Sequence, residues 1–147
     1  MVLTAARPAS ADDKERAKTL FREGRDAMTA GDYEIGCPLL ERSHTIVAAV
    51  GTLLNLALCE EKRGHLAVAR ERWKEARDLA QKENDARAKV AAERLAQLEK
   101  RTPKLTVNIQ GGAASVRTQR DGKQPRDVPT AQLGKPLRLD PGKYDVL

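Results

Sequence analysis

Apolar residues recur at helical spacing through most of the first hundred positions of the chain. Residues 51–80, GTLLNLALCEEKRGHLAVARERWKEARDLA, predict two helices joined by a tight turn at Arg63 and Gly64. The first of these helices is apolar on nearly every side, so it needs cover from several neighbours. The second keeps a charged face between apolar positions at Leu66, Ala69, Trp73 and Ala76. This hairpin is therefore expected to form the centre of a larger helical assembly.

Another helical hairpin is predicted upstream of the first. Amphipathic stretches cover residues 13–28 and about 33–47, and a Gly-Asp pair separates them. Asp12 or Asp13 is expected to cap the first stretch, because aspartate accepts a hydrogen bond from a free backbone N–H at a helix start. The helical part of the chain is therefore predicted to begin at about residue 12.

A third amphipathic stretch follows at residues 84–101. Asn84 is expected to cap it, and its apolar face holds Ala88, Ala91, Leu95 and Leu98. An array of repeats needs a terminal helix that covers the last apolar surface. About two heptads are too few to favour a self-associating coiled coil, so this stretch is predicted to close the array.

After the third stretch, the spacing of apolar residues changes from the helical period to strict alternation with polar residues. Leu105, Val107 and Ile109 alternate with polar residues, as in a half-buried strand. Asp-Gly at residues 121–122 predicts a hairpin, and Asp-Pro-Gly at residues 140–142 predicts a turn. The chain is therefore predicted to be mainly α with a small antiparallel β module, and its predicted parts are residues 1–11, 12–101 and 102–147.

The two hairpins are similar to each other at an offset of 33 residues. The first hairpin carries small residues, one aromatic residue and one leucine at Gly24, Ala27, Gly31, Tyr33, Gly36, Leu40 and Ser43. This pattern resembles that of tetratricopeptide (TPR) repeats, which stack as antiparallel helical hairpins. The resemblance implies an array of about two repeats plus a capping helix, with a groove that binds a peptide or partner protein.

In such arrays the first helix of each repeat lines the groove. The resemblance implies that eight residues approach a bound peptide, namely Lys18, Phe21, Arg25, Met28, Leu54, Asn55, Leu58 and Lys62. Some TPR domains hold a peptide carboxylate with Lys, Asn and Arg side chains. Asn55 stands at one such asparagine position, whereas Phe21 replaces a lysine. Asn55 is therefore interpreted as a buried amide that bonds to a neighbouring turn.

The C-terminal half resembles a second known module. Its segments KLTVNI, GGAASVRTQRDGK and LGKPLRLDPGKYDV are similar to the PEGA domain, a small β module of bacterial surface proteins. Residues 124–132 match that pattern poorly and its final strand is missing, so the module is predicted to be incomplete. Helical repeats joined to such a module resemble envelope proteins of soil bacteria such as myxobacteria.

The first eleven residues contain a small-x-small tripeptide, Ala9-Ser10-Ala11, which fits a signal-peptidase site. They are expected to be either the remnant of a signal peptide or a disordered segment. The signal interpretation places the protein in the periplasm or cell envelope, and a cytoplasmic adaptor is the alternative. No run of 18 apolar residues occurs in the sequence, so no membrane span is expected in this chain.

The two halves of the chain differ in net charge. The net charge is +6, and 8 Lys/Arg against 4 Asp follow Thr102, while the helical half is almost neutral. This excess favours a second function, binding of an anionic polymer such as an envelope polysaccharide, a lipid surface or a nucleic acid. Specific nucleic-acid recognition is not expected, because Tyr144 is the only aromatic residue there that could stack on a base.

Cys37 and Cys59 fall on adjacent helices of the predicted array. In an exported protein they are expected to form a disulfide, whereas in the cytoplasm they would be buried thiols. A zinc site with His44 and His65 is not expected, because seven helical residues separate Cys37 from His44 by roughly 10 Å. No catalytic motif or cofactor-binding loop is recognised, so the protein is predicted to be a non-enzymatic scaffold without cofactors.

Overall fold

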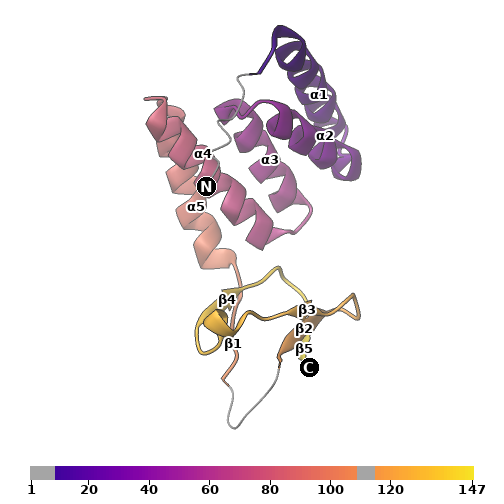
Figure 1. The fold of residues 1–147 in the computed structure, drawn as a ribbon, viewed down its shortest axis with the longest axis vertical. Helices are drawn as coiled ribbons and strands as arrows, with labels where there is room; N and C mark the ends of the chain where they lie inside the picture. Colours follow the sequence, from indigo (N-terminus) through magenta and orange to yellow (C-terminus); the bar gives the residue numbers. More distant parts are fainter. Residues whose placement is uncertain (1–8, 109–114) are drawn as a thin grey trace, which may run out of the picture.

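The computed structural model describes residues 9–108 and 115–147, which form five helices followed by a small β module (Figure 1). The helices are α1 (Ala11–Thr29), α2 (Tyr33–Ile46), α3 (Val50–Lys62), α4 (Leu66–Lys82) and α5 (Arg87–Arg101). The β module contains β1 (Lys104–Thr106), β2 (Arg117–Arg120), β3 (Arg126–Asp127), the short 3-10 helix η1 (Thr130–Gln132), β4 (Pro136–Arg138) and β5 (Tyr144–Val146). The predicted fold class, mainly α with a small antiparallel β module, is confirmed at this level.

Consecutive helices pack against each other, α1 with α2, α3 with α4 and α4 with α5. Gly31 and Gly64 lie in the turns of the first two hairpins, with φ angles of 83° and 76° that favour glycine. In both turns the residue after the glycine donates its N–H to the carbonyl five residues earlier, at 2.9 Å. The two turns therefore repeat one geometry at the offset that the internal similarity predicts.

The start of α1 differs from the prediction, because Ser10 is the N-cap residue in place of Asp12 or Asp13. The Ser10 Oγ accepts a hydrogen bond from Asp13 N at 3.1 Å. The Asp13 Oδ2 accepts one from Ser10 N at 3.0 Å, which completes a capping box. Of the segment 1–11, predicted to be a signal-peptide remnant or disordered, residues 1–8 lie outside the described residues, whereas Ser10 and Ala11 belong to the start of α1.

The prediction that Asn84 caps the third stretch is wrong. Asn84 follows the end of α4 in the left-handed conformation, with a φ of 55°. Helix α5 begins only at Arg87, whose backbone N donates to the Asp85 Oδ1 at 2.9 Å. Asparagine tolerates positive φ better than most residues, so it serves at the end of one helix as readily as at the start of another.

The buried apolar residues of the helices form two clusters. One joins α2 to α3 and contains Cys37, Leu40, Leu56 and Cys59. The other joins α3, α4 and α5 and contains Leu53, Ala57, Leu66, Ala69, Trp73, Ala76, Ala91, Leu95 and Leu98. Because α3 contributes to both clusters, it is the buried centre of the helical array, as its nearly all-round apolar sequence predicts.

The β module contains two small antiparallel sheets. One sheet pairs β1 with β4, and the other has the strand order β3-β2-β5. Three buried valines form its core, Val107, Val116 and Val128. Asp121 and Gly122 have φ angles of 49° and 71°, so the predicted Asp-Gly turn is present after β2. Strand β1 ends at Thr106, and Ile109 of the predicted strand lies outside the described residues.

Candidate functional site

The eight residues predicted to line a peptide groove lie on two helices. Helix α1 carries Lys18, Phe21, Arg25 and Met28, and helix α3 carries Leu54, Asn55, Leu58 and Lys62. Three of them are exposed cations, Lys18, Arg25 and Lys62, and the other five are half-buried. Helices α1 and α3 also contact each other directly, over a narrow region.

The half-buried groove residues divide between the two helical clusters. Phe21 and Met28 pack against the cluster around the cysteines, whereas Leu54 and Leu58 pack against the cluster of α3 to α5. Beside Phe21 is a shallow hollow of about 230 Å³, and the Arg25 guanidinium lies 5.8 Å from the centre of the Phe21 ring. The predicted groove residues therefore divide between two apolar clusters, and the hollow beside Phe21 is lined by α1 alone.

Asn55 is half-buried, and its amide finds its partner within its own helix. The Asn55 Nδ2 donates to the backbone oxygen of Gly51 at 2.8 Å, one turn earlier in α3. The amide therefore has a partner in the preceding turn of its own helix, but Asn55 is half-buried and not buried as predicted. A side-chain amide has two N–H donors and one carbonyl, so this bond uses one of the donors.

Cys37 and Cys59 form the predicted disulfide, which links α2 to α3. The two Cα atoms are 5.7 Å apart, and the residues are 1% and 0% exposed. The bond therefore joins the first hairpin to the second inside the core. Its sulfur atoms cannot serve as thiolate ligands, and residues 9–108 and 115–147 contain no group of three or more side chains placed to hold a metal ion.

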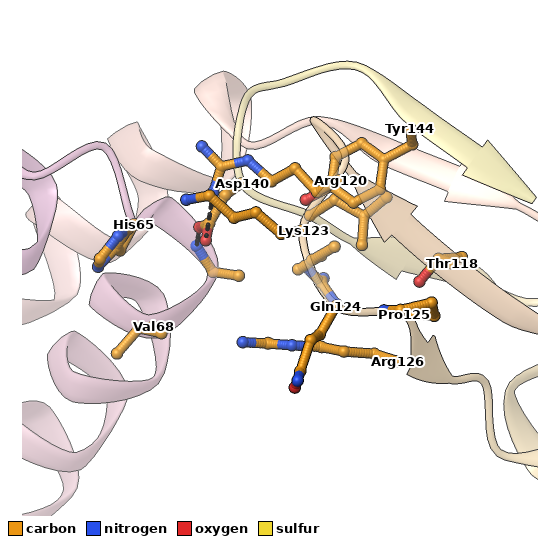
Figure 2. A pocket seen from close by; sticks show the side chains of 13 residues that line it. His65, Val68, Thr118, Arg120, Lys123, Gln124, Pro125, Arg126, Asp140 and Tyr144 are labelled. Atoms are coloured by element: carbon orange, nitrogen blue, oxygen red, sulfur yellow. Dashed lines mark hydrogen bonds and ion pairs between the residues drawn. The ribbon is translucent and has the colours of Figure 1, made fainter.

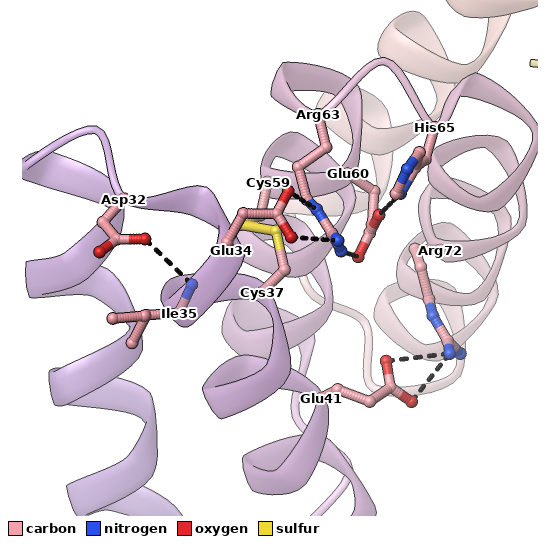
Figure 3. A network of polar contacts seen from close by, with 10 residues as sticks. All are labelled: Asp32, Glu34, Ile35, Cys37, Glu41, Cys59, Glu60, Arg63, His65 and Arg72. Atoms are coloured by element: carbon pink, nitrogen blue, oxygen red, sulfur yellow. Dashed lines mark hydrogen bonds and ion pairs between the residues drawn. A yellow bond between two sulfur atoms is a disulfide. The ribbon is translucent and has the colours of Figure 1, made fainter.

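A chain of charged side chains runs beside the disulfide and connects the hairpins (Figure 3). Arg63, at the end of α3, donates to both carboxylate oxygens of Glu34 on α2, at 2.8 and 3.0 Å. The Arg63 Nη1 also lies 3.3 Å from Glu60 Oε1, and the Glu60 Oε2 lies 2.7 Å from His65 Nδ1. The hydrogen bonds from Arg63 hold the pKa of Glu34 below its usual value. This network fixes the turn of the second hairpin to α2.

Low pH is expected to lower the thermal stability of the helical half. Hydrogen bonds from Arg87 lower the pKa of Asp85 from 3.8 to about 2, and those from Arg70 lower the pKa of Glu99. Because the folded state favours the ionised carboxylates, their stabilisation is present above the unfolded pKa and is lost as the pH falls through the folded pKa. We expect the Tm to fall as the pH drops from about 5 to about 2.

Thermal unfolding followed by circular dichroism measures this dependence. The Asp85→Asn variant should show a shallower decline of Tm with falling pH than the wild type, because one of the responsible carboxylates is absent. Identical slopes for the two proteins would contradict the role of Asp85. Since these carboxylates are near the surface, salt should reduce the effect.

A cavity of about 400 Å³ lies between the start of α4 and the β module (Figure 2). Its wall carries four cationic side chains, Arg120, Lys123, Arg126 and Arg138, and one carboxylate, Asp140. In Figure 2, Lys123 and Arg126 extend from the β module toward the helix. The sequence indicates the basic excess of this half, but the cavity itself depends on segments that are far apart in the chain.

Asp140 joins the β module to the helices. Its Oδ1 accepts a hydrogen bond from Ala67 N at 2.8 Å, in the first turn of α4. His65, the N-cap residue of α4, makes no side-chain capping bond within the described part of the chain. Asp140 therefore caps α4 from 73 residues away. Its Oδ2 lies 3.3 Å from the Arg120 Nη1, so the same carboxylate also contacts β2.

Replacing Asp140 with alanine is expected to loosen the β module from α4, since loss of a helix cap costs about 1 kcal/mol. Limited digestion with trypsin should then cut faster after Arg101, the last residue of α5, and after Lys104, the first residue of β1. The control is Asp145→Ala, which removes an exposed carboxylate from β5. Equal cleavage rates for the two variants would show that Asp140 does not hold the module in place.

The structure describes no helix that combines the length and the apolar character needed to cross a membrane. Comparison of the chain with protein-family models, curated proteins and solved structures gave no match in any of the three. The function of the protein is therefore inferred from the geometry and chemistry of its own residues.

Proposed function

We propose that the protein is a non-enzymatic scaffold that binds a peptide or partner protein on a TPR-like helical array. The observation that supports this most is the neighbouring pair α1 and α3, where half-buried apolar side chains lie beside exposed cations. A bound segment would cover the exposed parts of Phe21 and Met28 and would pair acidic groups with Lys18 and Arg25. The proposed partner segment therefore has apolar anchors flanked by acidic residues.

The disulfide supports a location in the periplasm or cell envelope, because disulfides persist in oxidising compartments. The β module, which resembles an incomplete PEGA domain, would then face the envelope. A cytoplasmic protein would keep Cys37 and Cys59 as free thiols. Alkylation of the protein from its native cells, in denaturant and without reductant, distinguishes the two states. The denaturant exposes both buried residues, so an oxidised pair adds no mass and two thiols add two alkyl groups.

Replacing Phe21 and Arg25 together with alanine is expected to reduce partner capture about tenfold or more, because an aromatic residue and an arginine are the usual anchors of an interface. Crosslinking followed by affinity capture from an envelope fraction, with each captured protein quantified by mass spectrometry, measures the loss. Phe21 also packs against the helical core, so circular dichroism must show that the variant is folded at the temperature of the assay.

The matched control is Ile35→Ala with Arg42→Ala, which also removes one apolar side chain and one arginine. Both residues are exposed on α2, and Ile35 is 56% exposed. The control is expected to capture the same partners as the wild type. If the folded Phe21 and Arg25 variant captures them equally well, the α1 and α3 surface is not the binding site.

A further inference from the structure

We propose that the cavity between α4 and the β module binds an acidic saccharide unit, a sugar that carries a carboxylate or a phosphate. This site lies away from the predicted groove residues of α1 and α3, so it does not depend on peptide binding there. Three properties of the cavity support the proposal. They are its excess of positive charge, the availability of two of its cations, and the uncharged polar groups between them.

The positive charge of the cavity exceeds what its one carboxylate can neutralise. Asp140 is already engaged, because its Oδ1 accepts from Ala67 N and its Oδ2 faces Arg120. Arg138 pairs with Glu99, which lies outside the wall, so Lys123 and Arg126 are the two cations that add unmatched positive charge to the cavity. A cleft lined by one sign of charge attracts ligands of the opposite sign. An oxyanion is the ligand group that this wall fits.

Two of the four cations are held in place and two are available. Asp140 and Asp121 each lie 3.3 Å from Arg120, and Glu99 lies 3.6 Å from Arg138. Lys123 and Arg126 are exposed, and neither has an ion-pair partner among residues 9–108 and 115–147. These two side chains can therefore form charge-assisted hydrogen bonds with a carboxylate or phosphate at little cost.

Uncharged groups in the same wall favour a sugar over a bare anion. Thr118, Gln124 and Tyr144 offer hydroxyl and amide groups to sugar hydroxyls, and Val68 and Pro125 offer an apolar surface to the ring. The Tyr144 hydroxyl is protonated at neutral pH, as in any tyrosine, and burial raises its pKa further. One aromatic residue cannot stack successive bases, which disfavours single-stranded nucleic acid. A volume of about 400 Å³ is within the range of small-ligand pockets.

Titration of the full chain with small sugars, followed by nuclear magnetic resonance, tests the proposal. Glucuronate carries a carboxylate, glucose 6-phosphate carries a phosphate, and glucose is the neutral control. At least one anionic sugar is expected to bind about tenfold or more tightly than both glucose and inorganic phosphate, with shifts at residues 118–126. Whichever anionic sugar binds more tightly identifies the preferred acidic group, a carboxylate or a phosphate. If neither anionic sugar exceeds glucose and inorganic phosphate, the proposal is overturned.

Charge variants test whether the cavity itself is responsible. Lys123→Gln with Arg126→Gln is expected to weaken binding of the better sugar about tenfold. The control, Arg117→Gln with Lys135→Gln, removes the same charge from exposed positions of the β module that do not line the cavity, and less than about a twofold change is expected. Equal weakening by the two pairs would attribute the binding to overall charge and would overturn the proposal.

Two further measurements separate this proposal from its alternatives. The Phe21 and Arg25 variant should bind the sugar as the wild type does, so failure of the peptide proposal would leave this one intact. Polygalacturonate should compete with the small sugar for the cavity. Single-stranded DNA of equal total charge should compete less well at about 0.15 M salt, and equal competition would overturn the preference for a saccharide.

Discussion

Reduction of the Cys37–Cys59 disulfide is expected to lower the free energy of unfolding by about 3 kcal/mol. The two cysteines are 22 residues apart, and a cross-link across a loop of that length restricts the unfolded chain. The same bond is a second covalent connection between the two hairpins, in addition to the backbone at residues 47–49. Urea denaturation of the oxidised and the reduced protein measures the difference.

Two spectroscopic signals show which part of the helical array loses stability when the disulfide is reduced. Trp73 is the only tryptophan and lies in the cluster of α3 to α5, so its fluorescence reports that cluster, while circular dichroism reports all the helices. After reduction, part of the dichroism should be lost at lower urea than the fluorescence change, as the first hairpin separates. The Cys37→Ala and Cys59→Ala double variant should unfold at the same urea concentrations as the reduced protein. Addition of reductant should not change its midpoints. Unchanged midpoints on reduction would contradict the prediction.

Replacing Gly36 with alanine is expected to destabilise the protein by about 1–3 kcal/mol, as overpacking of a core does. In an open helical position the same substitution stabilises by about 1 kcal/mol. A Cβ at Gly36 would lie 3.0 Å from Gly24 O and 3.2 Å from Met28 N, both backbone atoms of α1. Because backbone atoms cannot rotate away, α1 and α2 would have to move apart.

Gly51→Ala is the matched control for this substitution. Gly51 is also helical, but its new Cβ would approach only the end of the Arg87 side chain, at 3.3 Å, among the described residues. The Arg87 guanidinium can move, so this variant is expected to be neutral or more stable than the wild type. Urea denaturation should therefore show a loss of stability for Gly36→Ala and no loss for Gly51→Ala. A stabilised Gly36→Ala protein would contradict the close approach of α1 and α2.

The helical half of the fold could be predicted closely because its signals are local. A glycine at residue 31 and another at residue 64 set the turns, and the helical period sets which face of each helix is apolar. The helix starts were predicted less well. Ser10, Asp12 and Asp13 are all good capping residues, and the two hydrogen bonds of the capping box place the cap at Ser10.

The candidate sites could be predicted only in part, since both depend on contacts between distant segments. Periodicity places Phe21 and Leu54 on apolar faces, but it does not show that they pack against different clusters. The Asp-Pro-Gly sequence predicts the turn that contains Asp140, but nothing local indicates that its carboxylate reaches Ala67. The basic composition of the C-terminal half was visible, whereas its arrangement around a cavity required the fold.

Because Asp140 caps α4, the cap can form only after the β module has been synthesised. The ribosome releases α4 before it has made the residue that closes the first turn of that helix, 73 positions later. The start of α4 therefore remains open to water in the nascent chain until the last turn of the β module docks. In the finished protein, a mechanical pull on the β module would load this hydrogen bond together with the backbone that joins α5 to β1.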